Sequence, residues 1–127
     1  MELEDYCRTL TAASNKLYVV CGNYGKGGTG ANGYQTTLDN GRVTVPNRLW
    51  KVIVVLPVGS NDVSRVTSST RVVAVNTPND NALSSDWGSY RTSVDAIEQA
   101  SGLDLLSALP IGVQAAVEAQ ADSGPTQ

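Results

Sequence analysis

Glu4 and Arg8 are the two side chains whose types and spacing best suit catalysis or the binding of a charged ligand. Residues four apart lie on one face of a helix, so this carboxylate and this guanidinium point the same way. Together such groups bind a phosphate, or a water held by a metal ion. The same spacing also describes a solvated ion pair worth about 0.3–0.5 kcal/mol, and spacing alone favours this simpler interpretation.

The residue types that the chain lacks narrow the chemistry further. The 127 residues include no histidine, which excludes a Ser-His-Asp triad, a Cys-His pair and an imidazole metal ligand from this chain. Two cysteines are too few for a zinc site made of thiolates alone. The formal net charge of −3 does not favour a general polyanion binder, although single basic residues can still contact phosphate. Catalysis by these residues would use carboxylates, Arg, Lys, Tyr or hydroxyl groups.

Two further features have both a chemical and a structural interpretation. Residues 25–33 contain two overlapping GxGxxG patterns after an expected strand. No amphipathic helix follows them to hold a pyrophosphate, so we expect a loop and not a dinucleotide site. Cys7 and Cys21 flank a helix end and a turn, which leaves open a disulfide or two buried free thiols, with free thiols as the simpler expectation.

Other conspicuous side chains are expected to have structural roles. Trp50 begins an apolar run and is expected in the core. Trp87 and Tyr90 are expected to pack a loop and not to stack on bases. Asp95 and Glu98 are most simply a capping carboxylate and a carboxylate on a helix surface.

The elements that must position these residues follow from periodicity and turn chemistry. Apolar residues at i, i+3/i+4 and i+7 predict a helix over 2–13, with acidic residues in its first turn. Continuous β-prone runs predict strands over 17–21, 49–56 and 71–76. The glycine-rich segment 22–41 is expected to be one long loop, either mobile or functional.

The last third of the chain is predicted to be helical. Thr92 and Asp95 resemble a capping box, and Gly102 fits the position just after that helix. A short helix is expected over 103–109, and Pro110 suits the first turn of another. The order of elements predicts an α+β fold with a mixed, largely antiparallel sheet flanked by helices.

The length of the chain allows one domain, which we expect over 1–122, with a frayed tail over 123–127. No apolar run approaches the roughly 20 residues of a membrane span, so no membrane partner is expected. The acidic start lacks the apolar core of a secretory signal, and the sequence leaves the localisation open.

Several motifs, taken in order, resemble the later part of the DNA/RNA non-specific endonucleases, the ββα-metal family that includes Serratia-type nucleases and endonuclease G. A helix with "LExxxR" at 3–8 leads to a strand that ends in Gly22. A "VPxxxWK" strand follows at 45–51, and a further strand ends in a Pro-Asn turn at 78–79. The closing helix "SVxxIExxxGxDLLxxLP" corresponds to 93–110. The resemblance implies the C-terminal part of a ββα-metal nuclease-like domain.

The resemblance also implies roles for two residues. Glu4 corresponds to the acidic residue that holds the water shell of a Mg²⁺ ion, and Arg8 to the arginine that stabilises the phosphate being cleaved. The family takes its general-base histidine from a "DRGH" motif and its direct Mg²⁺ ligand from an asparagine. Both lie upstream of "LExxxR", so neither falls within these 127 residues. Because loss of an essential base costs about 10²–10⁴-fold or more, we expect the chain to be inactive alone.

The expected function is therefore the C-terminal portion of a Mg²⁺-dependent, sequence-non-specific DNA/RNA endonuclease. Its expected partners are DNA or RNA, together with a complementary N-terminal half or further copies of this chain. The alternative is a non-catalytic module that binds nucleic acid or protein. The redox state of the cysteines and the oligomeric state stay open, while full-length relatives of this kind are often secreted or periplasmic.

Overall fold

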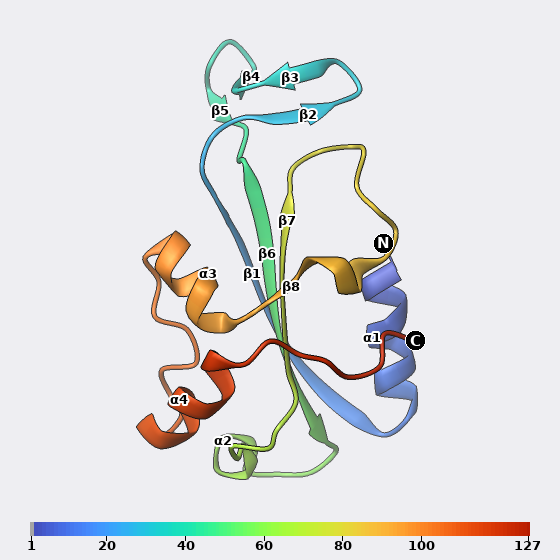
Figure 1. The fold of residues 1–127 in the computed structure, drawn as a ribbon, viewed down its shortest axis with the longest axis vertical. Coiled ribbons are helices and arrows are strands. Elements are labelled where there is room, and N and C mark those ends of the chain that lie inside the picture. The colour runs from blue at the N-terminus through green and yellow to red at the C-terminus, as the bar shows by residue number, and fades with distance from the viewer. Residues whose placement is uncertain (1) are drawn as a thin grey trace.

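The computed structural model describes residues 2–127. Its ribbon shows a central sheet with helices on both sides and a set of small hairpins at one end (Figure 1). The elements, in chain order, are α1 Glu2–Ala12, β1 Asn15–Tyr24, β2 Gly28–Gly30, β3 Gly33–Gln35, β4 Thr37–Leu38, β5 Val43–Thr44, β6 Arg48–Pro57, α2 Asp62–Arg65, β7 Val72–Pro78, the 3₁₀ turn η1 Trp87–Tyr90, β8 Arg91–Thr92, α3 Val94–Ser101 and α4 Ile111–Ala119.

The main sheet has four strands in the order β1-β6-β7-β8, and every neighbouring pair is antiparallel. The long apolar run of β6 lies in the interior of the sheet, where both of its faces are covered, as the sequence predicted. β1 pairs with β6 along its whole length, from Asn15 opposite Pro57 to Tyr24 opposite Arg48. The predicted α+β class with a largely antiparallel sheet is confirmed.

The alternation of side chains along β6 divides the interior into two cores. Trp50, Val52, Val54 and Leu56 face α3 and α4, with Val94, Ile97, Leu109 and Val117 packed against them. Ile53 and its neighbours face α1 and η1, where the buried residues are Leu3, Tyr6, Val73, Val75 and Trp87. Helices therefore cover both faces of the sheet (Figure 1).

The glycine-rich segment 22–41 is not the single long loop that the sequence predicted. Its first residues complete β1, and β2 and β3 then form a hairpin. Gly33 closes that hairpin at a φ of 84°, a left-handed conformation that glycine adopts without strain. β2 is held against the end of β7, because the amide of Thr29 donates to the carbonyl of Asn79 at 2.9 Å. The glycines thus permit tight turns, and the GxGxxG patterns lie in and just before this hairpin and not at the start of a helix.

Two predictions in the C-terminal third are wrong in detail. Ser93, not Thr92, caps α3, because its hydroxyl accepts from the amide of Ala96 at 3.1 Å. Residues 103–109 form irregular backbone and turns and not a helix. The amide of Leu105 donates to the carboxylate of Glu98 and not to a backbone carbonyl of a helix. The prediction for Gly102 is confirmed, because this residue ends α3 at a φ of 75°.

The tail over 123–127 has no regular secondary structure but lies against the α1 side of the sheet (Figure 1). Arg71 donates to the carbonyl of Pro125 at 2.7 Å, and the indole of Trp87 donates to the carbonyl of Thr126 at 3.3 Å. Asp122, just before the tail, binds Arg71 at 2.8 Å and Arg91 at 3.1 Å. These contacts hold a segment whose composition predicts fraying.

Among residues 2–127, no helix combines the length and the hydropathy that crossing a bilayer requires.

Candidate active site

The helix α1 is fixed to the sheet by two buried side chains one turn apart. Leu3 is 1% exposed and Tyr6 is 6% exposed. The ring of Tyr6 stacks on the indole of Trp87 with 5.4 Å between centroids, and its hydroxyl accepts from Arg71 at 2.6 Å. Trp50 is buried in the core, as predicted, and Trp87, which was expected only to pack a loop, is buried in the core as well. This anchoring orients the face of α1 that carries Glu4 and Arg8.

Glu4 binds a residue that the sequence interpretation had not assigned to the site. Lys51 on β6 donates a hydrogen bond from its ammonium to the carboxylate of Glu4, 47 residues away in the sequence. Burial by itself would raise the pKa of Glu4, but the hydrogen bond and the charge of Lys51 outweigh it, so this pKa is lowered. Glu4 is therefore ionised at neutral pH.

The sequence contained a signal for Lys51. It is the only charged residue inside the apolar run 49–56, at an odd position shared with Ile53 and Val55. Strand alternation places all three on the face toward α1. A lone cation on that face requires an acidic partner, and α1 supplies one.

Arg8 lies at the surface of α1. Its side chain is 77% exposed and pairs with Asp5, which is 72% exposed. The expected pair of Glu4 with Arg8 is replaced by two separate pairs, Lys51–Glu4 and Arg8–Asp5. An ion pair this exposed is weak, so the guanidinium of Arg8 is open to an anion from solution.

Both cysteines are free thiols in the structure. Cys7 is half-buried beside this site, and burial raises its pKa even though Lys51 acts in the opposite direction. Cys21, opposite Lys51 in the register, is exposed, so the expectation of two buried thiols is wrong for Cys21. Its strand is the edge of the sheet, which leaves one side of it uncovered.

The strand that carries Lys51 is positioned by the close approach of Trp50 to Gly22. The two residues are opposite each other on β6 and β1, and the indole lies across the glycine. A Cβ at Gly22 would meet Cζ2 of Trp50 at 2.5 Å, so no other residue fits without movement. The glycine that ends the predicted strand therefore has a packing role.

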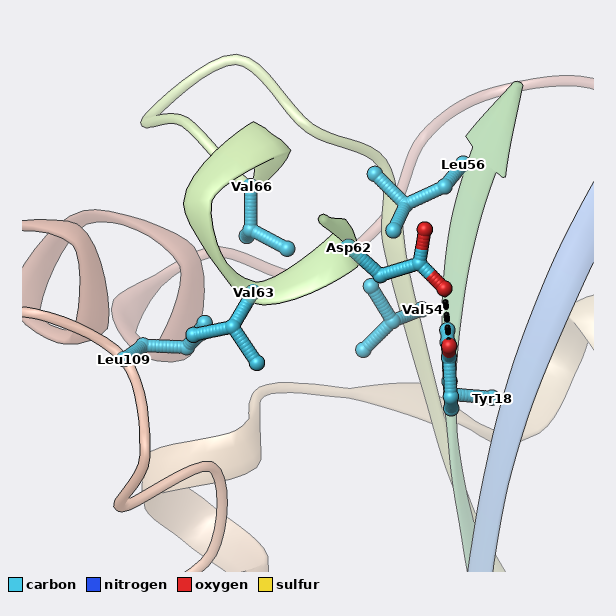
Figure 2. Close-up of a pocket in the computed structure, with 7 residues that line it drawn as sticks. All are labelled: Tyr18, Val54, Leu56, Asp62, Val63, Val66 and Leu109. Carbon is cyan, nitrogen blue, oxygen red and sulfur yellow. Dashed lines mark hydrogen bonds between the residues drawn. The ribbon is translucent and has the colours of Figure 1, made fainter. Parts of the chain in front are cut away.

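On the other face of the sheet, an apolar pocket lies between β6, α2 and the segment before α4, with Val54, Val63 and Leu109 among its lining residues (Figure 2). Asp62 and Tyr18 form its polar edge. Asp62 accepts from Tyr18, from Arg65 at 2.6 Å and from Lys16 at 2.9 Å. The hydrogen bond from Tyr18, followed by those from Arg65 and Lys16, lowers the pKa of Asp62. This acid is fully engaged in holding α2 to β1.

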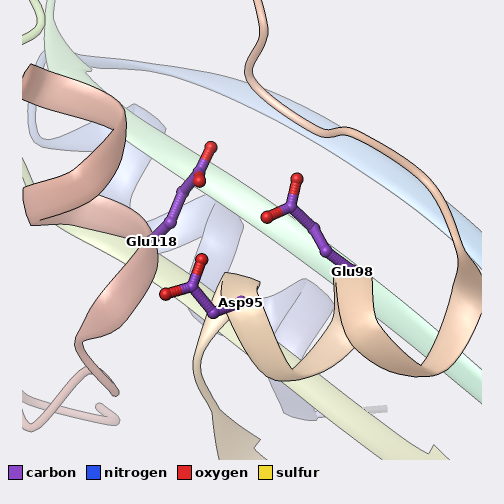
Figure 3. Close-up of side chains that lie close together, drawn as sticks. All are labelled: Asp95, Glu98 and Glu118. Atoms are coloured by element: carbon purple, nitrogen blue, oxygen red, sulfur yellow. The ribbon is translucent and has the colours of Figure 1, made fainter. Parts of the chain in front are cut away.

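Three carboxylates converge between α3 and α4: Asp95, Glu98 and Glu118 (Figure 3). Glu118 is 7% exposed, and sequence reasoning had given it no role although it is the only charged residue in α4. Burial, and then the charges of Glu98, Asp95 and Asp104, raise the pKa of Glu118 to about 7. Asp95 and Glu98 therefore belong to a cluster and are not isolated surface groups.

Comparison with known proteins shows the family to which this chain belongs. Residues 1–111 match the family described as DNA/RNA non-specific endonuclease. Over 121 residues the chain is 40% identical to a protein named "Nuclease" from Nostoc sp. (strain PCC 7120), an alignment that covers 95% of this chain and 41% of that protein. The chain thus spans about two-fifths of the length of this relative. Since the family match includes both α1 and the whole main sheet, the chain belongs to the DNA/RNA non-specific endonuclease family.

Proposed function

We propose that the chain forms the C-terminal portion of a Mg²⁺-dependent endonuclease domain that hydrolyses DNA or RNA without sequence specificity. The observation that carries the proposal is the geometry of α1 in a chain of this family. Glu4 is kept ionised by Lys51, and Arg8 presents an open guanidinium one helical turn further on. Carboxylate and guanidinium are the supporting groups that phosphodiester hydrolysis uses.

Glu4 fits the role of accepting hydrogen bonds from water molecules bound to a Mg²⁺ ion. Its side chain is 39% exposed, with Oε1 bound by Lys51 and Oε2 shielded from solvent, and carboxylate oxygens are the hard ligand type that such hydrated ions prefer. Within residues 2–127, Glu4 is not part of a group of three or more ligand side chains close enough to enclose an ion. A role through water therefore fits better than direct ligation. When bound, the metal ion supplies charge neutralisation and an acidic water.

Arg8 fits the role of binding the scissile phosphate. Its guanidinium offers paired N–H donors that match phosphate oxygens, and its charge stabilises the extra negative charge of the pentacoordinate state. Asp5 holds the guanidinium only through an exposed ion pair, so a phosphate displaces this carboxylate at little cost. Lys51 acts as a positioning residue, because it contacts Glu4 and fixes its charge state.

The remaining groups of the reaction must come from outside these 127 residues, which contain no histidine to act as base. The edge strand β1 is the surface that fits a completing segment. Its only sheet neighbour among residues 2–127 is β6, and Tyr18, Val19 and Val20 are 47%, 51% and 43% exposed. An unpaired strand edge with apolar side chains accepts another strand. The part of the Nostoc relative outside the alignment is long enough to supply one.

A reconstitution experiment tests this function. The chain would be mixed with the complementary segment of the Nostoc relative, and nicking of supercoiled plasmid would be followed with Mg²⁺ and with EDTA. We expect no cleavage by the chain alone and cleavage by the mixture with Mg²⁺. Arg8→Ala should lower the rate by about 10²-fold or more, because it removes a group that stabilises transition-state charge.

Arg42→Ala is the matched control for Arg8→Ala. Arg42 is 72% exposed and pairs with Asp39 at the same i,i+3 spacing, but it lies in the hairpins and not on α1. Equal effects of the two variants would contradict the assignment of Arg8. Mg²⁺-dependent cleavage by the chain alone, above a Glu4→Ala control, would contradict the need for a second segment.

The same samples separate a nuclease half from a non-catalytic module. Fluorescence anisotropy with labelled DNA at low and high salt measures binding directly, and a salt-sensitive affinity marks phosphate contacts. Light scattering measures self-association through the open β1 edge. Binding without cleavage in the reconstituted mixture would favour the non-catalytic alternative.

A further inference from the structure

The carboxylates of Asp95, Glu98 and Glu118 form an acidic cluster between two helices. One oxygen of each lies within 4.8 Å of one oxygen of the others. Asp95 and Glu98 are one turn apart on α3, and Glu118 reaches toward them from α4 (Figure 3). Such close like charges repel strongly in a partly buried setting unless a proton or a cation lies between them.

Glu118 is the residue that distinguishes this cluster from an ordinary acidic surface. Glu118 is only 7% exposed. Its Oε1 is shielded from solvent, and no described residue donates a hydrogen bond to that atom. The carboxylate points into the space that it shares with Asp95 and Glu98 (Figure 3). Desolvation of a carboxylate without a partner is costly, so a proton shared with Glu98 or a bound cation must stabilise this group.

Among residues 2–127, no lysine or arginine forms a salt bridge with this cluster. The last Lys or Arg in the sequence is Arg91, and the residues after it include only acidic charges. Asp104 adds a fourth carboxylate close enough to raise the pKa of Glu118. Among the described residues, the salt bridges formed by Arg71 and Arg91 both go to Asp122 and not to the cluster.

The three ligands stand on elements that are fixed by packing. Val94 and Ile97 of α3 are fully buried, and Val117 of α4 is 5% exposed. Oε2 of Glu98 also accepts from the amide of Leu105 at 2.7 Å, which orients that carboxylate. Side chains held in this way form a site whose geometry exists before a ligand arrives.

We propose that Asp95, Glu98 and Glu118 bind one Ca²⁺ ion that joins α3 to α4. The ligands are all carboxylate oxygens, which a hard cation prefers, and neither thiol nor imidazole is present to favour a softer metal. Ca²⁺ binds oxygens at about 2.3–2.6 Å, so ligand oxygens up to about twice that distance apart share one ion. Because Asp95 is exposed, water molecules can reach the ion and complete its coordination.

This site lies on the face of the sheet opposite to α1, so it does not depend on the proposed nuclease function. The ion would neutralise the carboxylates and link two helices that cover the core around Trp50. Its expected effect is on stability, and its test needs no activity measurement.

Calorimetric titration of the full chain with CaCl₂, after treatment with EDTA, tests the proposal. We expect one Ca²⁺ per chain, weaker binding of Mg²⁺, and a rise in Tm of roughly 5 °C at saturation. Glu118→Gln should weaken Ca²⁺ binding at least ten-fold and remove the rise in Tm. Asp39→Asn, which removes an exposed carboxylate in the hairpins, should leave both unchanged.

Circular dichroism first checks that Glu118→Gln is folded. If it is not, Asp95→Asn is the second variant, because Asp95 is exposed and its change leaves the core intact. The proposal is overturned if millimolar Ca²⁺ gives neither heat nor a change in Tm. It is equally overturned if folded variants at these positions bind Ca²⁺ as the unchanged chain does, or if Mg²⁺ binds more tightly than Ca²⁺.

Discussion

Lys51 on β6 donates a hydrogen bond to Glu4 on α1, and this contact joins the sheet to the helix that carries the candidate catalytic residues. Both side chains are about one-third exposed, at 32% and 39%. The contact therefore has two effects: it holds α1 in place, and it keeps the Glu4 carboxylate ionised.

Replacing Lys51 with Met should lower the free energy of unfolding by about 0.5–1 kcal/mol, because the ion pair is lost but is partly screened by solvent. Glu4→Gln should cost a similar amount. Urea unfolding of both single variants and of the double variant gives the coupling between the two side chains. Strictly additive effects would show that the contact contributes nothing to stability.

Gly22→Ala should destabilise the fold by about 1–3 kcal/mol, because its Cβ would collide with the indole of Trp50 in a packed core. Gly30→Ala is the control, since no atom lies within 4 Å of a Cβ built there. That variant should change stability by less than about 0.5 kcal/mol. Thermal unfolding of both compares them directly, and equal losses would contradict the packing role of Gly22.

Asp122→Asn should cost about 2–3 kcal/mol at neutral pH, because the side chain of Asp122 is 5% exposed and binds both Arg71 and Arg91. Burial would raise the pKa of Asp122, but these two guanidinium groups lower it overall. A lowered pKa gives stability that is complete above about pH 4 and is lost as the pH falls through the folded-state value. The difference between variant and unchanged chain should thus shrink in acid, which urea unfolding at a series of pH values measures.

The metal-free chain should become less stable between about pH 4.5 and pH 7, because Glu118 has a pKa of about 7 when folded against an ordinary value of 4.5. A raised carboxyl pKa means that the folded state keeps a proton that the unfolded state has released. In EDTA, unfolding free energy should fall by about 1–3 kcal/mol over this range. Glu118→Gln should abolish that fall, and a fall that persists in the variant would assign it to other groups.

Local patterns in the sequence determined several elements and their ends. The i, i+3/i+4 spacing of Leu3, Tyr6 and Leu10 sets the face of α1 that packs on the sheet. The apolar run of β6 specifies a strand buried on both faces, and Gly102 ends α3 because it adopts a left-handed conformation. These features follow from the periodicity and steric limits of short segments, so neighbouring residues suffice to specify them. The ordered motifs likewise identified the family.

Only the tertiary structure decided which side chains meet. Lys51 reaches Glu4 because the register of β6 and the packing of α1 bring together residues 47 positions apart. Glu118 joins Asp95 and Glu98 because two separate helices pack over one face of the sheet, and Arg71 binds Asp122 across 51 positions. Contacts of this kind depend on helix docking and strand register, which no local pattern encodes. The candidate catalytic residues were therefore visible in the sequence, whereas their charge partners and the acidic cluster required the fold.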